Sequence, residues 1–412
     1  MNNQWSGGQY SVFRALLGAY LFVHFLHLLP WSAELFSSAG MLPDAALSPL
    51  AGLFPNLLTS LDAPGFVAAM LMSAAGAAVL FALGWRDKWA ALWMWYVLAC
   101  LFGRNPLIAN PALPYVGWML LAHLFAPAAP YGSLAARGRL DPGGNWRMPR
   151  EVFLAGWIVL ALSYSYSGYT KLLSPSWVDG QALSYVLQNP LARDHFLRDF
   201  FLWLPDGIRH SITLGILWLE FLFAPLALSR RLRPWLWGGM LVVQFGFVFL
   251  LNFADLTIPM LLFHLFTFDP AWLPAPSRAP REHVFYDGHC GLCHRVVRFI
   301  LAEDARRHFR LSPLQGAAIA ATLDRTVRAA LPDSFVVLRA DGNVLLRSDA
   351  AAHVLSRLGG LWRIGGWLLM RVPKEARNAA YDFVGRIRHR LFARPDRLCP
   401  MTPVELRERF LP

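Results

Sequence analysis

Apolar runs long enough to cross a bilayer recur through the first two thirds of the chain. A transmembrane helix needs about 20 mostly apolar residues. The pattern predicts eight such helices, and seven is the alternative count because the third, fourth and eighth runs are short. Their approximate ranges are 11–30, 65–84, 89–103, 112–127, 151–169, 211–228, 234–253 and 254–269. We therefore expect residues 1–270 to form a polytopic α-helical membrane bundle.

The pattern changes after residue 270. Residues 271–281 form a Pro-rich stretch that predicts a linker. Short β-type runs and helix-period segments then alternate in the order β-α-β-α-β-β-α, with Asp341-Gly342 as a hairpin turn between the last two strands. The predicted strands are 283–286, 309–312, 334–339 and 344–347, and the predicted helices are 290–302, 314–331, 349–358, 360–370 and 374–393. This order predicts a small α/β thioredoxin-like domain with a C-terminal helical extension over residues 282–412.

Composition supports a membrane protein. Hydrophobic residues make up 56% of the chain and charged residues 16%, against about 25% charged in a typical soluble protein. Disorder requires the opposite mix. The first apolar run has the length of a full span and lacks the small-residue cleavage pattern of a signal peptide. We therefore expect it to remain as a membrane helix.

The net charge of +12 is concentrated in the C-terminal third, where residues 281–412 hold 22 Lys/Arg and 13 Asp/Glu. A basic domain beside a bilayer is attracted to anionic headgroups, so membrane lipids are predicted partners. Nucleic acid is not expected, because no base-stacking or groove-reading motif accompanies the charge.

Loop charge predicts the orientation. If there are eight spans, the segments 86–88, 137–150 and 230–233 lie on one side and carry nine Lys/Arg, whereas the opposite side carries five. The more positive side is expected in the cytoplasm. This predicts a multi-pass protein of the inner (plasma) membrane with both termini, and the C-terminal domain, in the cytoplasm.

The segment Tyr286–Cys293 carries the clearest candidate chemistry. Cys290 is predicted at a helix N-terminus, where backbone N–H groups and the helix dipole lower the pKa of a thiol. Cys293 lies three residues on, within reach of a disulfide, and His289 adds positive potential. We predict Cys290 as the attacking thiol and Cys293 as the resolving thiol. Half of a zinc site or two inert buried thiols are the alternatives, although no second pair of ligands follows, so no metal is expected.

The motif Asp287-x-x-Cys290-x-x-Cys293 resembles that of the DCC family of thiol-disulfide oxidoreductases. Four later features add to the resemblance, which covers about 130 residues: the strand and turn at 309–315, the Asp341-Gly342 hairpin, the helix at 381–390 and the trailing Cys399. It implies exchange with a thiol protein or a small thiol, with Asp287 in a supporting role. Cys399 is either a third redox thiol or a buried one. Pro332 lies near the position of the proline that faces the dithiol in thioredoxins, displaced by a residue or two.

Ionisable residues in the apolar runs are candidate functional residues, because burying charge in a bilayer is costly. Lys171 ends the fifth run and either acts as a base or extends its ammonium to the interface. Glu220 lies within the sixth run and is predicted to face the bundle, protonated or paired. His24 and His27 share a helix face and are either ligand contacts or hydrogen-bonded within the bundle.

The run 164–172, with Ser167-Gly168 and Lys171-Leu172, is followed by Trp177-x-x-Gly180 and resembles the HTTM domain of the vitamin-K-dependent gamma-carboxylase-like superfamily. The resemblance implies that Lys171 acts as a base towards a quinol and that Glu220 belongs to the same site. No His occurs near residues 105–110 and the lumenal domain is absent, so glutamate carboxylation is not expected.

Together these features predict a membrane-bound thiol-disulfide oxidoreductase, coupled to a quinone or lipid-like substrate near Lys171 and Glu220. No cofactor is certain, and a quinone is the candidate. One alternative is a quinone- or lipid-modifying enzyme, related to the carboxylase/epoxidase, that uses Lys171. The other is a non-catalytic redox-sensing membrane scaffold.

Overall fold

A computed structural model describes residues 5–108, 110–276, 281–323, 325, 328, 335–395, 398–400 and 402–411. The chain forms two compact units. Phe13–Ala126 and Pro149–Phe268 make a helical unit, whereas Asn2–Val12, Pro127–Met148 and Asp269–Pro412 make a second unit that contains the sheet. The second unit is therefore assembled from three separate stretches of the chain.

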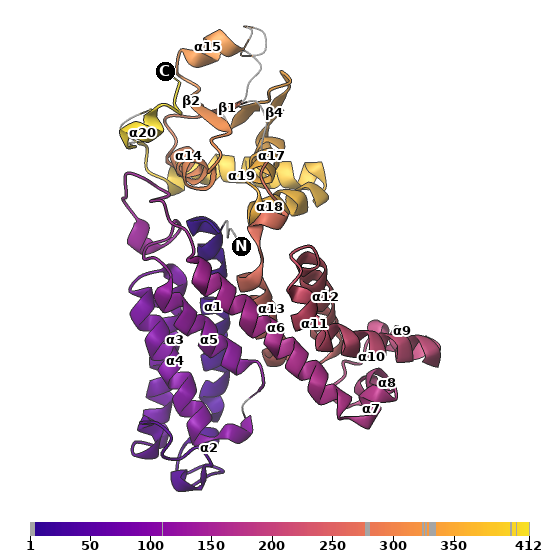
Figure 1. Cartoon of the computed structure of the whole chain (residues 1–412). Coiled ribbons are helices and arrows are strands. Elements are labelled where there is room, and N and C mark those ends of the chain that lie inside the picture. The colour runs from indigo at the N-terminus through magenta and orange to yellow at the C-terminus, as the bar shows by residue number, and fades with distance from the viewer. Residues whose placement is uncertain are drawn as a thin grey trace. The chain divides into compact units, whose positions relative to one another are not determined.

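The helical unit is built from long apolar helices joined by short ones (Figure 1). Each of the eight apolar runs predicted from the sequence lies on helix. The helices are α1 (Gly7–Leu28), α2 (Ser32–Phe36), α3 (Pro64–Leu83), α4 (Asp87–Arg104), α5 (Leu113–Phe125), α6 (Arg150–Leu172), α7 (Pro175–Val178), α8 (Ala182–Gln188), α9 (Phe196–Trp203), α10 (Asp206–Phe221), α11 (Phe223–Ala227), α12 (Arg233–Leu250) and α13 (Ala254–Thr267).

Four helical segments are long and apolar enough to cross a membrane, within the part of the chain that is described. They are Gly7–Phe36, Pro64–Leu83, Arg150–Leu172 and Arg233–Leu250. Leu113–Phe125 and Asp255–Thr267 are shorter apolar helices. The helical character predicted for this region is thus confirmed, whereas the count of eight spans stays a prediction.

The predicted helix at 211–228 is interrupted between α10 and α11. Pro225 has no N–H to bond the carbonyl of Phe221, four residues earlier. The Ser165 hydroxyl of α6 donates to that carbonyl at 2.9 Å and accepts from Ala224 N at 2.8 Å. Gly168 lies against the Phe221 backbone, where a Cβ would clash with Phe221 N. The break is therefore stabilised by α6 and places Glu220 at the end of α10.

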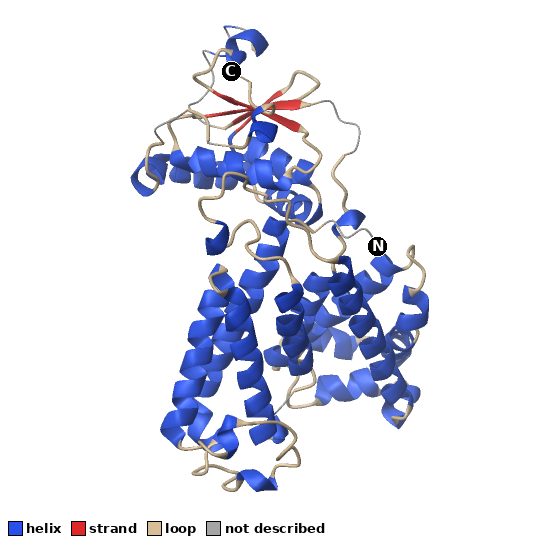
Figure 2. Ribbon diagram, turned by 60° about the vertical axis from the view of Figure 1, so that its left-hand side comes forward, coloured by secondary structure: helices blue, strands red, loops and turns tan. Residues whose placement is uncertain are grey.

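The second unit contains the sheet, whose strands are red in Figure 2. It is a four-stranded mixed sheet in the order β2-β1-β3-β4. β1 (Glu282–Tyr286) pairs parallel with β2 (Phe309–Pro313) and antiparallel with β3 (Val336–Leu338), which pairs antiparallel with β4 (Val344–Leu346). The helices are α14 (Gly291–Glu303), α15 (Ala318–Thr322), α17 (Arg347–Leu358), α18 (Gly360–Arg371), α19 (Lys374–Leu391) and α20 (Val404–Arg407).

This element order confirms the small α/β domain predicted from the sequence. α15 accounts for part of the predicted helix 314–331, and residues 324, 326, 327 and 329–334, including Pro332, lie outside the described residues. Beyond α20, the chain pairs with β2: Leu311 N donates to Arg409 O at 2.8 Å, and Leu411 N donates to Leu311 O at 3.0 Å.

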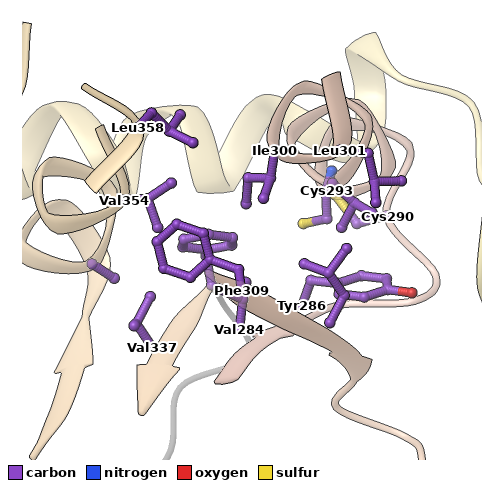
Figure 3. Close-up of a cluster of buried hydrophobic side chains, with 14 residues drawn as sticks. Val284, Tyr286, Cys290, Cys293, Ile300, Leu301, Phe309, Val337, Val354 and Leu358 are labelled. Carbon is purple, nitrogen blue, oxygen red and sulfur yellow. Dashed lines mark hydrogen bonds between the residues drawn. The ribbon is translucent and has the colours of Figure 1, made fainter. Parts of the chain in front are cut away.

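Alternating residues of β1 separate two cores. Val284 and Tyr286 face the larger core, which contains Cys290, Cys293 and apolar residues of α14 and α17 (Figure 3). Phe285 faces the opposite side of the sheet, where α15 packs. Successive strand residues point to opposite faces, so β1 anchors both layers. The dithiol is consequently part of the packed interior.

The N-terminal residues of the chain also belong to this unit. Glu303, at the end of α14, is buried and accepts hydrogen bonds from the Ser6 hydroxyl, from Gly8 N at 2.9 Å and from Trp362 Nε1 at 2.5 Å. Burial raises the pKa of this carboxyl. The three donors compensate for its burial.

Candidate active site

The dithiol lies where β1 gives way to α14. Cys290 is the N-cap residue of α14, with an extended backbone, and its Sγ accepts from Cys293 N at 3.4 Å. Capping groups satisfy N–H groups that have no partner in the first helical turn, and here the sulfur takes that role. Both thiols are free and buried, with 1% exposure for Cys290 and 6% for Cys293. The structure thus brings the two predicted thiols together.

The two thiols differ in acidity. The hydrogen bond from the Cys293 side chain lowers the pKa of Cys290 to about 6, and the backbone N–H of Cys293 and the positive charge of Arg388 act in the same direction. The same hydrogen bond, followed by burial, raises the pKa of Cys293. A thiolate on Cys290 with the proton retained on Cys293 is the resulting arrangement. It gives the two sulfurs the attacking and resolving characters predicted for them.

Asp287 organises the turn before the dithiol. Its carboxylate accepts from His289 N at 2.9 Å and from Gln315 Nε2 at 3.2 Å, and it pairs with Arg388 at 3.3 Å. Gln315 Oε1 in turn accepts from Gly288 N at 3.0 Å. The turn is therefore held by side chains from β1, from the loop after β2 and from α19.

Arg388 connects this turn to the thiols. Its Nη1 lies 3.9 Å from Cys293 Sγ, and Nη2 lies within hydrogen-bonding distance of the Asp287 carboxylate. Sequence reasoning included Gln315 in the strand and turn at 309–315 and Arg388 in the helix at 381–390, but it assigned neither residue a role. The helix that carries Arg388 was part of the family resemblance, but nothing in the sequence singled out this arginine among its neighbours.

The chain after α19 covers the dithiol turn. The imidazole of His294 lies 3.1 Å from both Gly288 O and Leu398 O, and burial lowers its pKa. A Cβ on Gly291 would clash with Ala393 O, and one on Gly288 would lie 3.0 Å from Leu398. This close packing accounts for the low exposure of Cys290.

The remaining predicted residues of this site have different surroundings. His289 contributes its backbone N–H to Asp287, and no hydrogen bond to its ring is found among the described residues. Cys399 is a half-buried free thiol. Burial and then the neighbouring Cys399 thiol raise the pKa of the Tyr286 hydroxyl. Cys399 is therefore placed beside Tyr286, at the end of β1.

Lys171 and Glu220 meet in the helical unit. Lys171 Nζ lies 2.5 Å from Glu220 Oε2 and 2.7 Å from Ser167 Oγ, and 4.9 Å above the Trp177 ring. The side chains are 17% and 5% exposed. The sequence placed both residues in one site without predicting this ion pair. Within the described ranges, no group of three or more His, Cys, Asp or Glu residues is arranged to hold a metal ion.

Comparison with known proteins concerns the dithiol domain. Residues 284–394 match the model of a family described as DCC1-like thiol-disulfide oxidoreductase. An uncharacterised protein of Bacillus subtilis, YuxK, is 32% identical over 140 residues, which are 33% of this chain and 98% of the relative. A chloroplastic DCC family protein of Arabidopsis thaliana is 28% identical over 116 residues, which are 28% of this chain and 67% of the relative. No solved structure matches.

Proposed function

Because the chain belongs, through residues 284–394, to the DCC1-like thiol-disulfide oxidoreductase family, we propose that it exchanges electrons with a thiol protein or a small thiol through Cys290 and Cys293. The observation that carries the proposal is the position of Cys290 at the N-terminus of α14, where its Sγ accepts from Cys293 N at 3.4 Å, and the opposite pKa shifts of the two thiols agree with it. The sheet order β2-β1-β3-β4, with the dithiol at the start of the helix after β1, supports a thioredoxin-like assignment for the domain.

In the reductive direction, the Cys290 thiolate attacks one sulfur of a substrate disulfide. A Cys290–substrate bond forms, the substrate S–S bond breaks, and one substrate thiolate leaves and takes a proton from solvent. Negative charge on Cys290 and its hydrogen bond both raise the pKa of Cys293. Since the mixed disulfide removes that charge, Cys293 becomes easier to deprotonate at the step that needs it.

Cys293 then attacks Cys290 Sγ. The protein disulfide forms and the second substrate thiolate leaves and is protonated, so the substrate gains two electrons from the dithiol and two protons, one released by Cys293 and one taken from solvent. Arg388, 3.9 Å from Cys293 Sγ, is proposed to stabilise the Cys293 thiolate in this step. Because Cys290 is buried, the chain after α19 must move to admit the substrate.

The test is a trapping experiment on the purified full-length protein. In the Cys399→Ser background, which removes the half-buried third thiol, the Cys293→Ser variant should accumulate a mixed disulfide with glutathione when treated with glutathione disulfide, and the Cys290→Ser/Cys293→Ser variant should not. Cys100→Ser is the matched control, because Cys100 is a buried thiol of α4. A glutathione adduct that forms equally without Cys290 would refute the mechanism.

We also propose that the helical unit is an HTTM-like, multi-pass domain in the inner membrane, with both termini and the dithiol domain in the cytoplasm. The four long apolar helices and the loop charges support this. Half-exposed Cys399 offers a native label. A membrane-impermeant maleimide should modify it in inverted vesicles and not in intact cells, and the reverse result would place the domain outside.

A second candidate function rests on the Lys171–Glu220 pair, for which we propose a quinone or lipid-like substrate of the helical unit. A buried ion pair 2.5 Å long at the end of an apolar helix is costly for stability alone, which favours a functional role. Lys171→Ala should abolish quinone- or lipid-dependent turnover, whereas Lys88→Ala should preserve it. If added quinone still oxidised the dithiol in Lys171→Ala, and failed to do so only in the Cys290 variants, Lys171 would be excluded from the pathway.

A further inference from the structure

An apolar cavity of about 450 Å³ lies within the helical unit. Its walls come from α1, α2, α4, α5 and the first turn of α13, and include Trp95, Phe102 and Trp118. Cavities of this size and lining typically hold small molecules through apolar contact and a few polar groups. Lys171 and Glu220 are not among the lining residues, so this site is distinct from the one proposed above.

Two polar residues of the cavity lining, His24 and Asp255, belong to one hydrogen-bond network centred on the Asp255 carboxylate. Its Oδ1 accepts from the Tyr20 hydroxyl at 2.7 Å and lies 3.0 Å from His24 Nδ1, while its Oδ2 accepts from Asn110 Nδ2 at 3.0 Å. His24 and Asp255 themselves line the cavity. An ionised carboxylate is an acceptor only, so three donors around it form a consistent network.

This network determines what His24 offers to a ligand. The Asp255 carboxylate engages one ring nitrogen, Nδ1, and a hydrogen bond at one ring nitrogen leaves the other for a different partner. Within the described part of the chain, the hydrogen bonds of His24 involve Nδ1 alone. Nε2 is therefore available for a hydrogen bond to a ligand, on a side chain that is 7% exposed and lines an apolar cavity.

We propose that this cavity binds a neutral lipid-like molecule whose hydroxyl head donates to His24 Nε2 and whose apolar body lies against Trp95 and Trp118. The Asp255 carboxylate disfavours an anionic head such as that of a fatty acid. Among the described residues, no Lys or Arg lines the cavity to pair with a phosphate. A phenol and an aliphatic alcohol share the required chemistry. The proposal does not rest on the dithiol chemistry.

Matched probes test the head-group requirement. The full-length protein in lipid nanodiscs is photolabelled with 4-decylphenol that carries a diazirine in its tail, and unlabelled competitors are then compared. We expect 4-decylphenol to compete at a concentration about tenfold lower than its methyl ether, the size of effect that one hydrogen bond gives, and 4-decylbenzoate to compete poorly. If 1-decanol also competes, the ligand is an aliphatic alcohol. If 1-decanol does not compete, the ligand is a lipid with a ring in its head group. Equal competition by phenol, ether and benzoate overturns the proposal.

Variants test the location. Gly117 lines the cavity, and a Cβ there would lie 3.5 Å from Trp95 at its closest approach. Gly117→Leu should fill the cavity and reduce labelling by about tenfold. Gly76→Leu adds the same side chain in α3, where no atom lies within 4 Å of a Cβ, and should leave labelling unchanged. His24→Phe should remove the preference for phenol over ether. Equal labelling of both glycine variants and the wild type also overturns the proposal.

Discussion

The Cys293 side chain is the largest cause of the low pKa of Cys290, and a pair of substitutions isolates it. Cys293→Ser keeps an O–H donor at the same position, whereas Cys293→Ala removes the donor. Neither variant can resolve a mixed disulfide, so both accumulate the adduct at Cys290. The difference between the two variants therefore reports the donor alone.

The size of the difference follows from the pKa. With a pKa of about 6, about nine tenths of Cys290 is thiolate at pH 7. In the limiting case in which the Cys293 donor supplies the whole shift, a pKa of about 8.5 leaves about 3%. Each thiolate becomes roughly tenfold more nucleophilic as its pKa rises by that amount. The two effects nearly cancel at pH 7. At pH 5.5 we expect the Ala variant to react about 20-fold more slowly than the Ser variant, and at pH 9 roughly tenfold faster.

The assay is the rate of glutathionylation by glutathione disulfide, followed by peptide-resolved mass spectrometry from pH 5 to 10. Peptide resolution separates Cys290 from Cys100 and Cys399. Rate profiles that cross between the two variants support the reasoning. Parallel profiles with one midpoint would show that the Cys293 donor does not set the acidity of Cys290, and would refute it.

Three other predictions concern stability. Asp287→Asn removes one partner of a buried ion pair and should lower the free energy of unfolding by about 3–5 kcal/mol. The control Glu408→Gln breaks an exposed pair and should lower it by less than about 1 kcal/mol. Equal losses of the two variants in thermal denaturation would contradict this. Gly291→Ala should displace the chain after α19 that covers Cys290, destabilise the protein by about 1–3 kcal/mol and speed alkylation of Cys290. Gly385 has open space around it, so the control Gly385→Ala should stabilise the protein by up to about 1 kcal/mol. Because folding lowers the pKa of Cys290 from about 8.5 to about 6, the reduced protein should gain stability as pH rises from about 6 to 8.5, and denaturant titrations of Cys290→Ser should lack that rise.

The sequence predicted those parts of the structure that depend on residues close together along the chain. Hydrophobic periodicity located the helices and strands, and the spacing of Asp287, Cys290 and Cys293 placed the dithiol at a helix N-terminus, because one turn of helix determines that geometry. The break before α11 was not predicted. It depends on Ser165 of α6, whose hydroxyl donates to the Phe221 carbonyl in place of the N–H that Pro225 lacks.

Long-range partners could not be predicted in the same way. Arg388 lies 101 residues from Asp287, and only the packing of α19 on α14 brings the two together. Likewise, the sequence marked Lys171 and Glu220 as costly charges in apolar helices, but their 49-residue separation concealed that each is the other's partner. Their roles in chemistry stay predictions.

The buried Glu303 has a consequence for how the protein is made. Its donors Ser6 and Gly8 stand at the beginning of the chain, and Ser6 is separated from it by 297 residues. At a synthesis rate of about 5–20 residues per second, the first helix waits roughly 15–60 seconds for the residue that caps it. Throughout that interval the N–H groups at its start must be satisfied by water or by another protein. Contacts of such sequence separation also slow folding, so the contact of Ser6 and Gly8 with Glu303 is expected to form late in folding.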